Sequence, residues 1–276
     1  MITVFIPTKD RAPQLDILLR SLSRLNFIDR VVVLWKASDD DFRKGYQKAF
    51  DNNDVIDIMI KETDFYDSYF KALSFCGDYV LGLTDDTFVY REAPFNQAEL
   101  LSTFSYDTLC VSLRLGLNTV IQDIANPNKM FSIPQEEELI VEGGKFLRWD
   151  WQKVGLDWNT GYPISLDGHI YKKDVLTNLS KGVEFRNLRE WEGNLVYYAK
   201  ENLKSLNKMV CWEKSLCVNI PINMVQPPYN IDVSPFSQSF YKMNEEFING
   251  ESFCVDYKED EIRGSHWYLP VRKMGI

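Results

Sequence analysis

The 276-residue sequence predicts an α/β fold with a mostly parallel central sheet flanked by helices. Short apolar runs alternate with amphipathic stretches through residues 2–83, which is typical of β-α-β units joined by right-handed crossovers. The runs are nearly continuous in apolar residues, as expected for strands that are buried on both faces. Two adjacent carboxylates, Asp85 and Asp86, directly follow the fourth run. Because ligands of parallel sheets collect at the carboxyl ends of strands, this edge is a candidate binding site.

The elements of the first half follow from this periodicity. Apolar runs predict strands at residues 2–6, 31–35, 55–60, 79–83 and 109–113. Apolar residues at helical spacing predict helices at about residues 15–25, 42–50, 65–73 and 97–104. Asp39, Asp40 and Asp41 are expected to open the second helix, because acids in a first turn suit the helix dipole. The predicted order is therefore β-α-β-α-β-α-β, followed by one further helix and strand.

The second half is less regular. Residues 116–137 contain Asn, Pro and Gly without clear periodicity and are predicted to form a long loop. Residues 139–149 predict a β-hairpin around Gly143 and Gly144. Further strands are expected at 165–171 and 216–220, and helices at 173–182, 188–203 and 239–248. No linker is apparent, so we predict a single domain, residues 1–276, with functional halves 1–115 and 116–276.

Composition limits the function. The net charge of −9 argues against nucleic acid as a partner, because a phosphate backbone needs a basic face. A single nucleotide remains possible if local Lys, Arg or a metal offsets the repulsion. No apolar run approaches the roughly 18 residues of a membrane span, and the first residues do not resemble a secretory signal. Five cysteines without a CxxC pair indicate free thiols in a reducing compartment, so we predict a cytoplasmic protein.

Several catalytic motifs are absent from the sequence. It contains no GxGxxG after the first strand, no GxxxxGK[ST] loop, no GxSxG elbow and no HExxH. With only His169 and His266, a zinc site built mainly on imidazoles is not indicated. What remains is a polar loop at residues 7–13 and the pair Asp85–Asp86. Asp85 and Asp86 can hold a hard divalent cation, which in turn can hold phosphates. The alternative interpretation is that both are ordinary polar residues of a turn that follows a strand.

Three stretches of the first half resemble a known family. They read Val-Phe-Ile-Pro-Thr-Lys-Asp-Arg at 4–11, Leu-Leu-Arg-Ser-Leu at 18–22, and Tyr-Val-Leu-Gly-Leu-Thr-Asp-Asp-Thr at 79–87. Their order and spacing resemble the GT-A class of nucleotide-sugar glycosyltransferases, and most of all the large inverting family that builds bacterial polysaccharides. That family opens with a strand ending in Pro-x-Tyr-Asn-Arg or a variant, and carries an Asp-x-Asp motif after its fourth strand. The resemblance covers about the first 115 residues well and the remainder loosely.

The resemblance implies a GT-A fold and a metal-dependent, inverting transfer of a sugar. The donor would be a UDP-, GDP- or dTDP-sugar bound by residues 1–115, and the acceptor a glycan or lipid-linked hydroxyl bound by residues 116–276. Contact with a membrane surface would accompany a lipid-linked acceptor. By matching position, four residues would line the base and ribose pocket: Pro7, Thr8, Asp10 and Arg11. Asp85 would reach the ribose. Asp86 would hold Mn²⁺ or Mg²⁺ against the diphosphate, with His266 completing the metal shell.

One departure concerns the base. The family usually places an acidic residue at the end of its second strand, where this chain has Leu-Trp-Lys-Ala-Ser-Asp at 34–39. Trp35 is a candidate to stack on the base and Asp39 to replace the missing acid, although a core position explains Trp35 equally well. The base therefore stays open.

An inverting transfer also needs a general base. Glu192, at the edge of the apolar face of the helix at 188–203, is the first candidate, and Asp167 is its rival. The aromatic residues around the hairpin form either an acceptor groove or a core: Trp149, Trp151, Trp158 and Tyr162.

Two other functions remain open. Sugar nucleotidyltransferases share the predicted sheet, but they begin with a glycine-rich loop, and residues 7–13 contain no glycine. A non-catalytic domain that binds a glycan or a partner protein would use the same fold without binding nucleotide.

Overall fold

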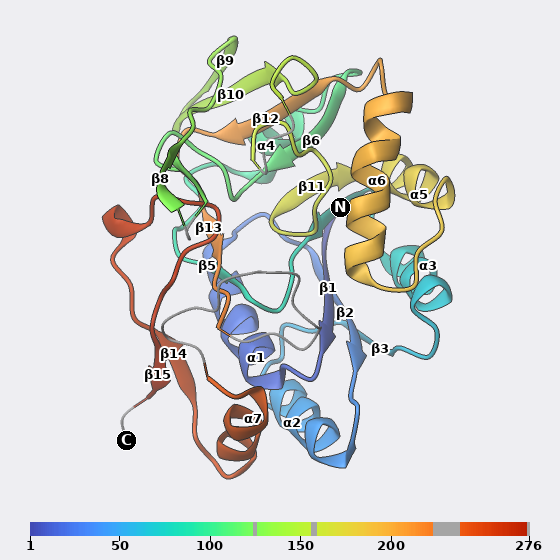
Figure 1. Ribbon diagram of the computed structural model, residues 1–276, viewed down its shortest axis with the longest axis vertical. Coiled ribbons are helices and arrows are strands. Elements are labelled where there is room, and N and C mark those ends of the chain that lie inside the picture. Colours follow the sequence, from blue (N-terminus) through green and yellow to red (C-terminus); the bar gives the residue numbers. More distant parts are fainter. Residues whose placement is uncertain (124–125, 156–158, 223–237, 275–276) are drawn as a thin grey trace.

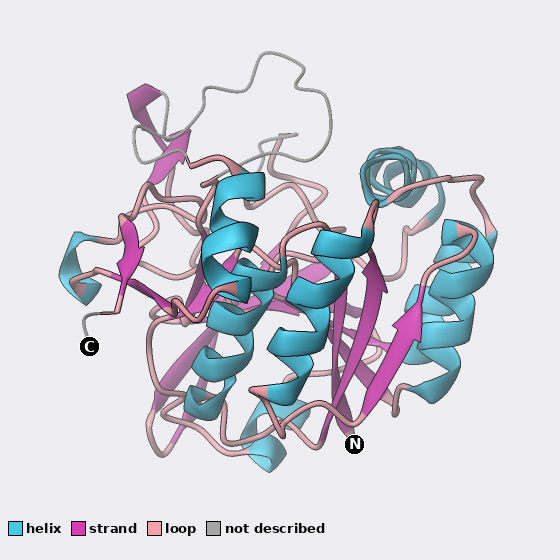
Figure 2. Cartoon of the chain, turned by 90° about the horizontal axis from the view of Figure 1, so that it is seen from below, coloured by secondary structure: helices cyan, strands magenta, loops and turns pink. Residues whose placement is uncertain are grey.

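The computed structural model describes residues 1–123, 126–155, 159–222 and 238–274. Its centre is a nine-stranded sheet in the order β3-β2-β1-β4-β11-β6-β12-β10-β9. Helices cover both faces of this sheet (Figures 1 and 2). The predicted α/β architecture with a mostly parallel sheet and flanking helices is therefore confirmed.

The first half folds as four parallel strands joined by helices. The strands are β1 (Ile2–Lys9), β2 (Arg30–Lys36), β3 (Ile58–Lys61) and β4 (Tyr79–Gly82). The helices between them are α1 (Ala12–Ser21), α2 (Asp40–Asp51) and α3 (Phe65–Phe75). Asp39 caps α2, because its carboxylate accepts hydrogen bonds from the backbone N–H groups of Asp41 and Phe42. The β-α-β prediction is confirmed for this half, although β3 begins three residues later than expected.

The second half makes the sheet mixed. Strand β11 (His169–Lys172) lies antiparallel between β4 and β6 (Thr108–Ser112). Strand β12 (Lys208–Trp212), which the sequence did not predict, runs parallel to β6. The hairpin of β9 (Glu137–Val141) and β10 (Gly144–Asp150) is present as predicted and extends the sheet edge.

The prediction of a long loop at 116–137 is wrong in part. The segment contains the short hairpin of β7 (Ile121–Asp123) and β8 (Asn126–Met130). These strands lack the apolar alternation that marks a strand with one buried face, so the sequence pattern could not show them.

The remaining elements include two small antiparallel pairs. The pairs are β5 (Thr87–Val89) with β13 (Cys217–Asn219), and β14 (Phe253–Val255) with β15 (Val271–Lys273). The remaining helices are α4 (Gln97–Ser102), α5 (Lys173–Lys181), α6 (Leu188–Asn202) and α7 (Phe240–Ile248). The β5–β13 pair sets Asn219 opposite Thr87, so it brings a residue of the second half next to the predicted carboxylate pair.

Two cores fill the space between sheet and helices. One contains side chains of α1, α2 and α7, and the other contains side chains of α3, α5 and α6. Trp149 and Trp151 are fully buried and donate their indole N–H groups to the carbonyls of Thr160 and Leu206. These two residues belong to the core and do not line an acceptor groove, whereas Trp158 lies outside the described residues.

All five cysteines are free thiols. Across the parts of the chain that the structure describes, every helix is too short or too polar to cross a membrane.

Candidate functional site

The carboxylate pair lies where the parallel strands end. Asp85 follows β4 and is buried, with 1% of its side chain exposed. One carboxylate oxygen accepts a 2.7 Å hydrogen bond from the Thr8 hydroxyl, and the other lies 2.6 Å from Arg11 Nη2. The loops after β1 and β4 are thus joined by charge and hydrogen bonding. Burial raises the pKa of Asp85 to about 6; repulsion from Asp86 adds to this rise, and Arg11 opposes it.

Asp86 lies nearer the surface. Its Oδ2 is 3.4 Å from Arg11 Nη1, while its Oδ1 accepts from the Thr84 hydroxyl at 2.7 Å and from Asn219 Nδ2 at 3.2 Å. The same Thr84 hydroxyl lies 2.8 Å from Asp167 Oδ1. A hydroxyl carries one hydrogen, so it can donate to only one of these two carboxylates at a time.

Asp167 and His266 arrive from the second half. Asp167 Oδ2 lies 3.5 Å from Arg114 Nη1 and 3.8 Å from His266 Nε2. Burial opposes ionisation of Asp167, but the charges of Arg114 and His266 bring its pKa below the ordinary value. The His266 side chain is 44% exposed, and its backbone forms a β-bridge with Asn219. Asp86, Asp167 and His266, all singled out in the sequence, therefore surround Thr84 and Asn219.

Glu192 belongs to the same cluster. It lies in the second turn of α6, whose N-terminus is capped by the Asn187 side chain. Glu192 Oε2 accepts a 3.2 Å hydrogen bond from the Ser165 hydroxyl. Ser165 Oγ in turn accepts a hydrogen bond from the backbone N–H of Asp167. Burial raises the pKa of Glu192 to about 8, and repulsion from Asp167 adds to the rise. The two candidate bases are thus neighbours in opposite electrostatic environments.

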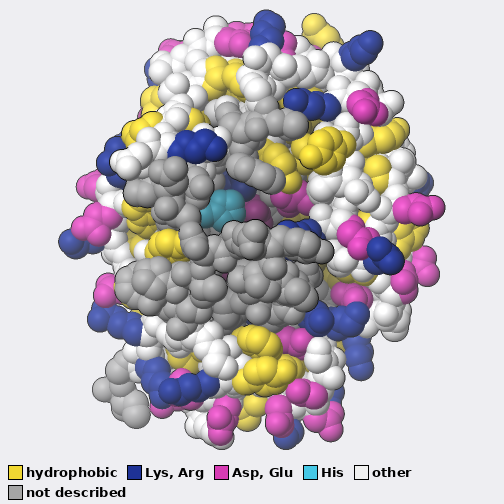
Figure 3. All heavy atoms as spheres, viewed as in Figure 1, with side chains coloured by type: hydrophobic (Ala, Val, Ile, Leu, Met, Phe, Trp, Pro, Cys, Tyr) yellow, Lys and Arg dark blue, Asp and Glu magenta, His cyan; other side chains and the backbone are white. Residues whose placement is uncertain are grey.

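A pocket of about 920 Å³ opens beside Asp85. Its walls come from the ends of β1, β2, β3 and β4, from Phe65, and from residues 186–194 at the start of α6. The predicted residues Pro7, Thr8 and Arg11 line it. Figure 3 shows the molecule from the side of Figure 1, with a histidine and acidic side chains visible near its centre.

The structure places Asp10, Trp35 and Asp39 outside the walls of this pocket. Asp10 accepts hydrogen bonds from the backbone N–H and hydroxyl of Ser38, so it ties two loops together. Trp35 is half-buried against Tyr46 and a further ring of α2, which matches the core alternative. Asp39 is exposed and occupied as the cap of α2. For these three residues, local structure accounts for the side chain without a ligand.

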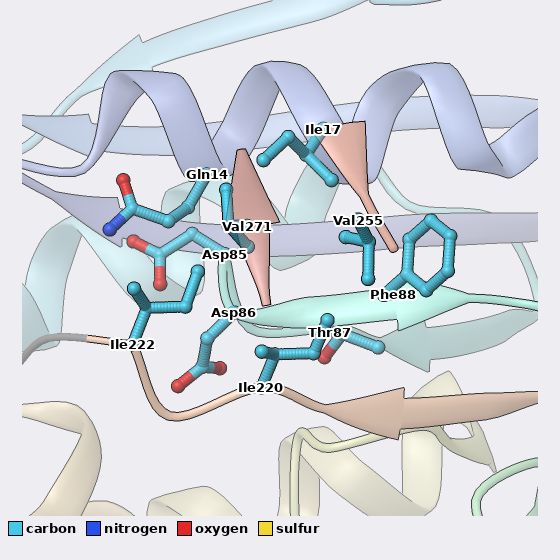
Figure 4. Close-up of a pocket in the computed structure, with 10 residues that line it drawn as sticks. All are labelled: Gln14, Ile17, Asp85, Asp86, Thr87, Phe88, Ile220, Ile222, Val255 and Val271. Atoms are coloured by element: carbon cyan, nitrogen blue, oxygen red, sulfur yellow. The ribbon is translucent and has the colours of Figure 1, made fainter. Parts of the chain in front are cut away.

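Other residues take the place that these were predicted to fill. Lys36 and Glu62, at the ends of β2 and β3, line the pocket and form a 2.6 Å ion pair. Gln14, in α1, lines a separate small cavity with Asp85 and Asp86 (Figure 4). Sequence reasoning missed all three. Lys36 and Glu62 could have been found, because Lys36 directly follows the predicted strand at 31–35 and Glu62 lies two residues after the predicted strand at 55–60.

The donor set suits a hard divalent cation in part. Asp86 and Asp167 offer carboxylate oxygens and His266 offers an imidazole nitrogen, which are ligands that Mn²⁺ accepts. Within the described residues, however, no three His, Cys, Asp or Glu side chains are grouped closely enough to hold a metal by themselves. A metal here would need ligands from a bound substrate.

No family model and no curated protein matches the sequence. Among solved structures, the chain is similar to TarS of S. aureus in complex with UDP, with a TM-score of 0.49 and 14% identity over 90% of this chain and 64% of that chain. For a longer TarS structure only 36% of that chain is covered, so this chain spans about one third to two thirds of the TarS chains it matches.

Two further likenesses are weaker. Glucosyl-3-phosphoglycerate synthase from Mycobacterium tuberculosis, in complex with Mn²⁺, UDP and phosphoglyceric acid, gives a TM-score of 0.39 and 11% identity over 76% of this chain and 66% of that chain. The 4-diphosphocytidyl-2C-methyl-D-erythritol synthase from Anaerococcus prevotii gives a TM-score of 0.41 and 16% identity over 80% of this chain and 90% of that chain. At these identities the likeness concerns the fold alone.

Proposed function

We propose that this chain is a glycosyltransferase that moves a sugar from a nucleoside diphosphate to a hydroxyl group of a glycan or lipid-linked acceptor. The observation that carries the proposal is the 920 Å³ pocket at the carboxyl ends of the parallel strands, which ends on Asp85 beside Asp86. Its volume is that of a site for a ligand of nucleotide size. The order of the Pro7–Arg11 loop and the carboxylate pair, from which the resemblance to GT-A enzymes was drawn, agrees with this use.

The charge of the pocket supports a diphosphate ligand. The chain carries a net charge of −9, yet cationic side chains outnumber acidic ones in this wall. The cationic residues are Lys9, Arg11, Lys36, Arg186 and Arg189, and the acidic residues are Glu62, Asp85 and Glu190. An anion entering this pocket is therefore attracted locally although the whole protein repels it.

Asp86 and His266 are the residues that would hold Mn²⁺ or Mg²⁺, with diphosphate oxygens completing the shell. Such a metal neutralises charge on the leaving nucleoside diphosphate. Thr84 and Asn219 hold Asp86 in place from two sides, with contacts to its Oδ1 at 2.7 and 3.2 Å. Arg11 adds a fixed positive charge on the other oxygen.

Asp167 fits the role of general base better than Glu192. A base must be ionised to accept the proton of the acceptor hydroxyl. The pKa of Asp167 is lowered chiefly by Arg114 against the effect of burial, whereas burial raises the pKa of Glu192 to about 8. At neutral pH, Asp167 is ionised and Glu192 largely protonated. Attack by the deprotonated hydroxyl on the face opposite the leaving group would invert the sugar.

Thermal shift measurements test the proposal. UDP, GDP, CDP and dTDP are added with and without Mn²⁺, and at least one pair is expected to raise the melting temperature. Asp86→Ala is expected to remove the Mn²⁺-dependent part of the shift while the variant still melts cooperatively. A sugar nucleotidyltransferase would instead respond to a nucleoside triphosphate and a sugar phosphate. If no nucleotide changes the melting temperature, the domain is a non-catalytic binding module and the proposal is wrong.

A further inference from the structure

Tyr46 is a buried tyrosine whose hydroxyl group bonds to the loop at the end of β1. It lies in α2, is fully buried, and lies outside the walls of the large pocket. Its hydroxyl lies 2.8 Å from the Thr8 hydroxyl and accepts a 3.3 Å hydrogen bond from the backbone N–H of Arg11. Thr8 and Arg11 both line that pocket. A residue outside the candidate site therefore contacts two residues of its wall.

The number of available hydrogens fixes the direction of each bond. The Asp85 carboxylate, paired with Arg11 Nη2 at 2.6 Å, is an anion that only accepts, so the Thr8 hydroxyl donates to it at 2.7 Å. Thr8 has then used its only hydrogen and must accept from the Tyr46 hydroxyl. Tyr46 has in turn used its hydrogen, so its oxygen accepts from the Arg11 N–H. The bonds thus run in one direction from the Arg11 backbone to the Asp85 carboxylate, where the Arg11 guanidinium closes a ring.

The backbone between Thr8 and Arg11 has an uncommon conformation. Asp10 has a φ of 56°, and it is the only residue other than glycine with a positive φ in the part of the chain that the structure describes. Such a conformation persists where the surroundings hold it in place. Ser38 bonds both carboxylate oxygens of Asp10, and Tyr46 bonds residues before and after it in the chain. Without the Tyr46 hydroxyl, this loop would lose one of the contacts that hold it.

The ring of bonds connects three residues of the pocket wall: Thr8, Arg11 and Asp85. A wall that is already held in its binding conformation loses less conformational entropy when a ligand enters, so its affinity is higher. We propose that Tyr46 is a positioning residue, which holds the loop after β1 and the carboxylate after β4 in the arrangement that binds the nucleoside diphosphate. This inference rests on the proposed function.

Isothermal titration of Tyr46→Phe tests this. The substitution removes one oxygen atom and keeps the aromatic ring, which packs against Trp35 and Phe50. UDP, GDP, CDP and dTDP are each titrated in the presence of Mn²⁺. The affinity for whichever of them binds the wild-type protein is expected to fall by about 5- to 10-fold, which corresponds to the loss of one hydrogen bond.

Tyr90→Phe is the matched control. Tyr90 is 1% exposed, and its hydroxyl lies 2.6 Å from the Ser215 hydroxyl and accepts from Asn118 Nδ2 at 3.1 Å. It therefore bonds one hydroxyl and one N–H group, as Tyr46 does, but it lies outside the walls of the pocket and has no bond to them. This variant should lower the melting temperature by a similar amount and leave the nucleotide affinity at the wild-type value.

A second background shows whether Tyr46 acts through the loop. Thr8→Val removes the hydroxyl that links Tyr46 to Asp85 and keeps the shape of the side chain. Adding Tyr46→Phe to Thr8→Val is expected to change the affinity by less than about twofold, because the link is already broken. A tyrosine that served stability alone would have the same effect on affinity in both backgrounds.

Three results would overturn the inference and leave the proposed function standing. They are a wild-type affinity in Tyr46→Phe, an equal loss of affinity in Tyr46→Phe and Tyr90→Phe, and an undiminished effect of Tyr46→Phe in the Thr8→Val background. If no nucleotide binds the wild-type protein, both the inference and the proposed function are wrong.

Discussion

Arg11 and Asp85 form a buried ion pair at the strand ends. Arg11 Nη2 lies 2.6 Å from Asp85 Oδ1, and the two side chains are 16% and 1% exposed. The same guanidinium reaches Asp86 at 3.4 Å, so one cation serves two adjacent carboxylates. Because these carboxylates follow each other in sequence, their Cα atoms stay about 3.8 Å apart. Arg11 thus holds together a charge arrangement that would otherwise repel itself.

Replacing Arg11 by Met should destabilise the protein in a pH-dependent way. Removing one partner of a buried pair leaves the other charge uncompensated, at a cost of about 3 kcal/mol. The pKa of Asp85, about 6 in the folded protein, lies above its unfolded value of 3.8, so Asp85 favours folding less as pH rises through this interval. Without Arg11 this pKa rises further, so the loss of unfolding free energy should be larger at pH 8 than at pH 5.

Urea denaturation at both pH values measures this difference. Arg43→Met is the control, because Arg43 pairs with Asp40 on the exposed surface of α2 and should change stability little. An equal loss at the two pH values would show that Arg11 acts by packing and not by charge.

Thr84→Val removes the hydroxyl shared by Asp86 and Asp167 while keeping the shape of the side chain. The two carboxylates then lose their common donor, and the unfolding free energy should fall by about 1–2 kcal/mol. If Asp86 lies at a metal site, excess Mn²⁺ with bound nucleoside diphosphate should recover much of this loss.

Thr103→Val is the comparison variant for Thr84→Val. Thr103 is buried and donates to the Leu100 carbonyl in α4, so the difference in unfolding free energy between this variant and the wild type should be the same with and without Mn²⁺. If the difference for Thr84→Val is also the same with and without Mn²⁺, this would argue against a metal at Asp86.

The parts of the fold that sequence could predict are those with local signals. The strands before Asp86 are apolar on both faces, so the hydrophobic pattern was sufficient to predict them. Asp39 caps α2, so this residue was sufficient to predict where the helix starts. The direction of β11 was not predictable, because an apolar run carries no sign of whether it enters the sheet parallel or antiparallel. The three-residue strands β5 and β13 are too short for a periodic signal.

The same distinction applies to the site. Asp85 and Asp86 adjoin a predicted strand, so their position was predictable. Asn219 lies 133 positions after Asp86 and reaches it through the pairing of β13 with β5. Gln14 sits between Pro13 and Leu15 in an amphipathic helix, where a glutamine is expected to face solvent. It lines a small cavity together with Ile220, Ile222 and Val255, which come from distant parts of the chain.

The pH dependence of transfer should distinguish Asp167 from Glu192 as the base. With Asp167, whose pKa is lowered, the rate should be nearly independent of pH between 6 and 9. With Glu192, the rate should rise with a midpoint near its pKa of about 8. Asp167→Asn is expected to reduce kcat by about 100-fold or more, and Glu192→Gln by much less. Nucleotide binding by both variants, measured by titration, controls for misfolding; a rate that follows a pKa near 8 would assign the base to Glu192.

Lys9 and Arg189 are expected to bind the diphosphate of the donor. Both line the large pocket on opposite sides, at the end of β1 and the start of α6. Replacing each by Met should lower the affinity for UDP, or for whichever nucleoside diphosphate binds, by about 5- to 10-fold, because one charged hydrogen bond is lost. Binding of the corresponding nucleoside, which has no phosphate, should not change. The UDP affinity of the wild type should also fall with salt more steeply than that of either variant.

Lys200→Met, on α6 outside the pocket wall, is the control and should leave the affinities for nucleoside and nucleoside diphosphate unchanged. If Lys9→Met or Arg189→Met lowered both affinities equally, these cations would lie at the base instead.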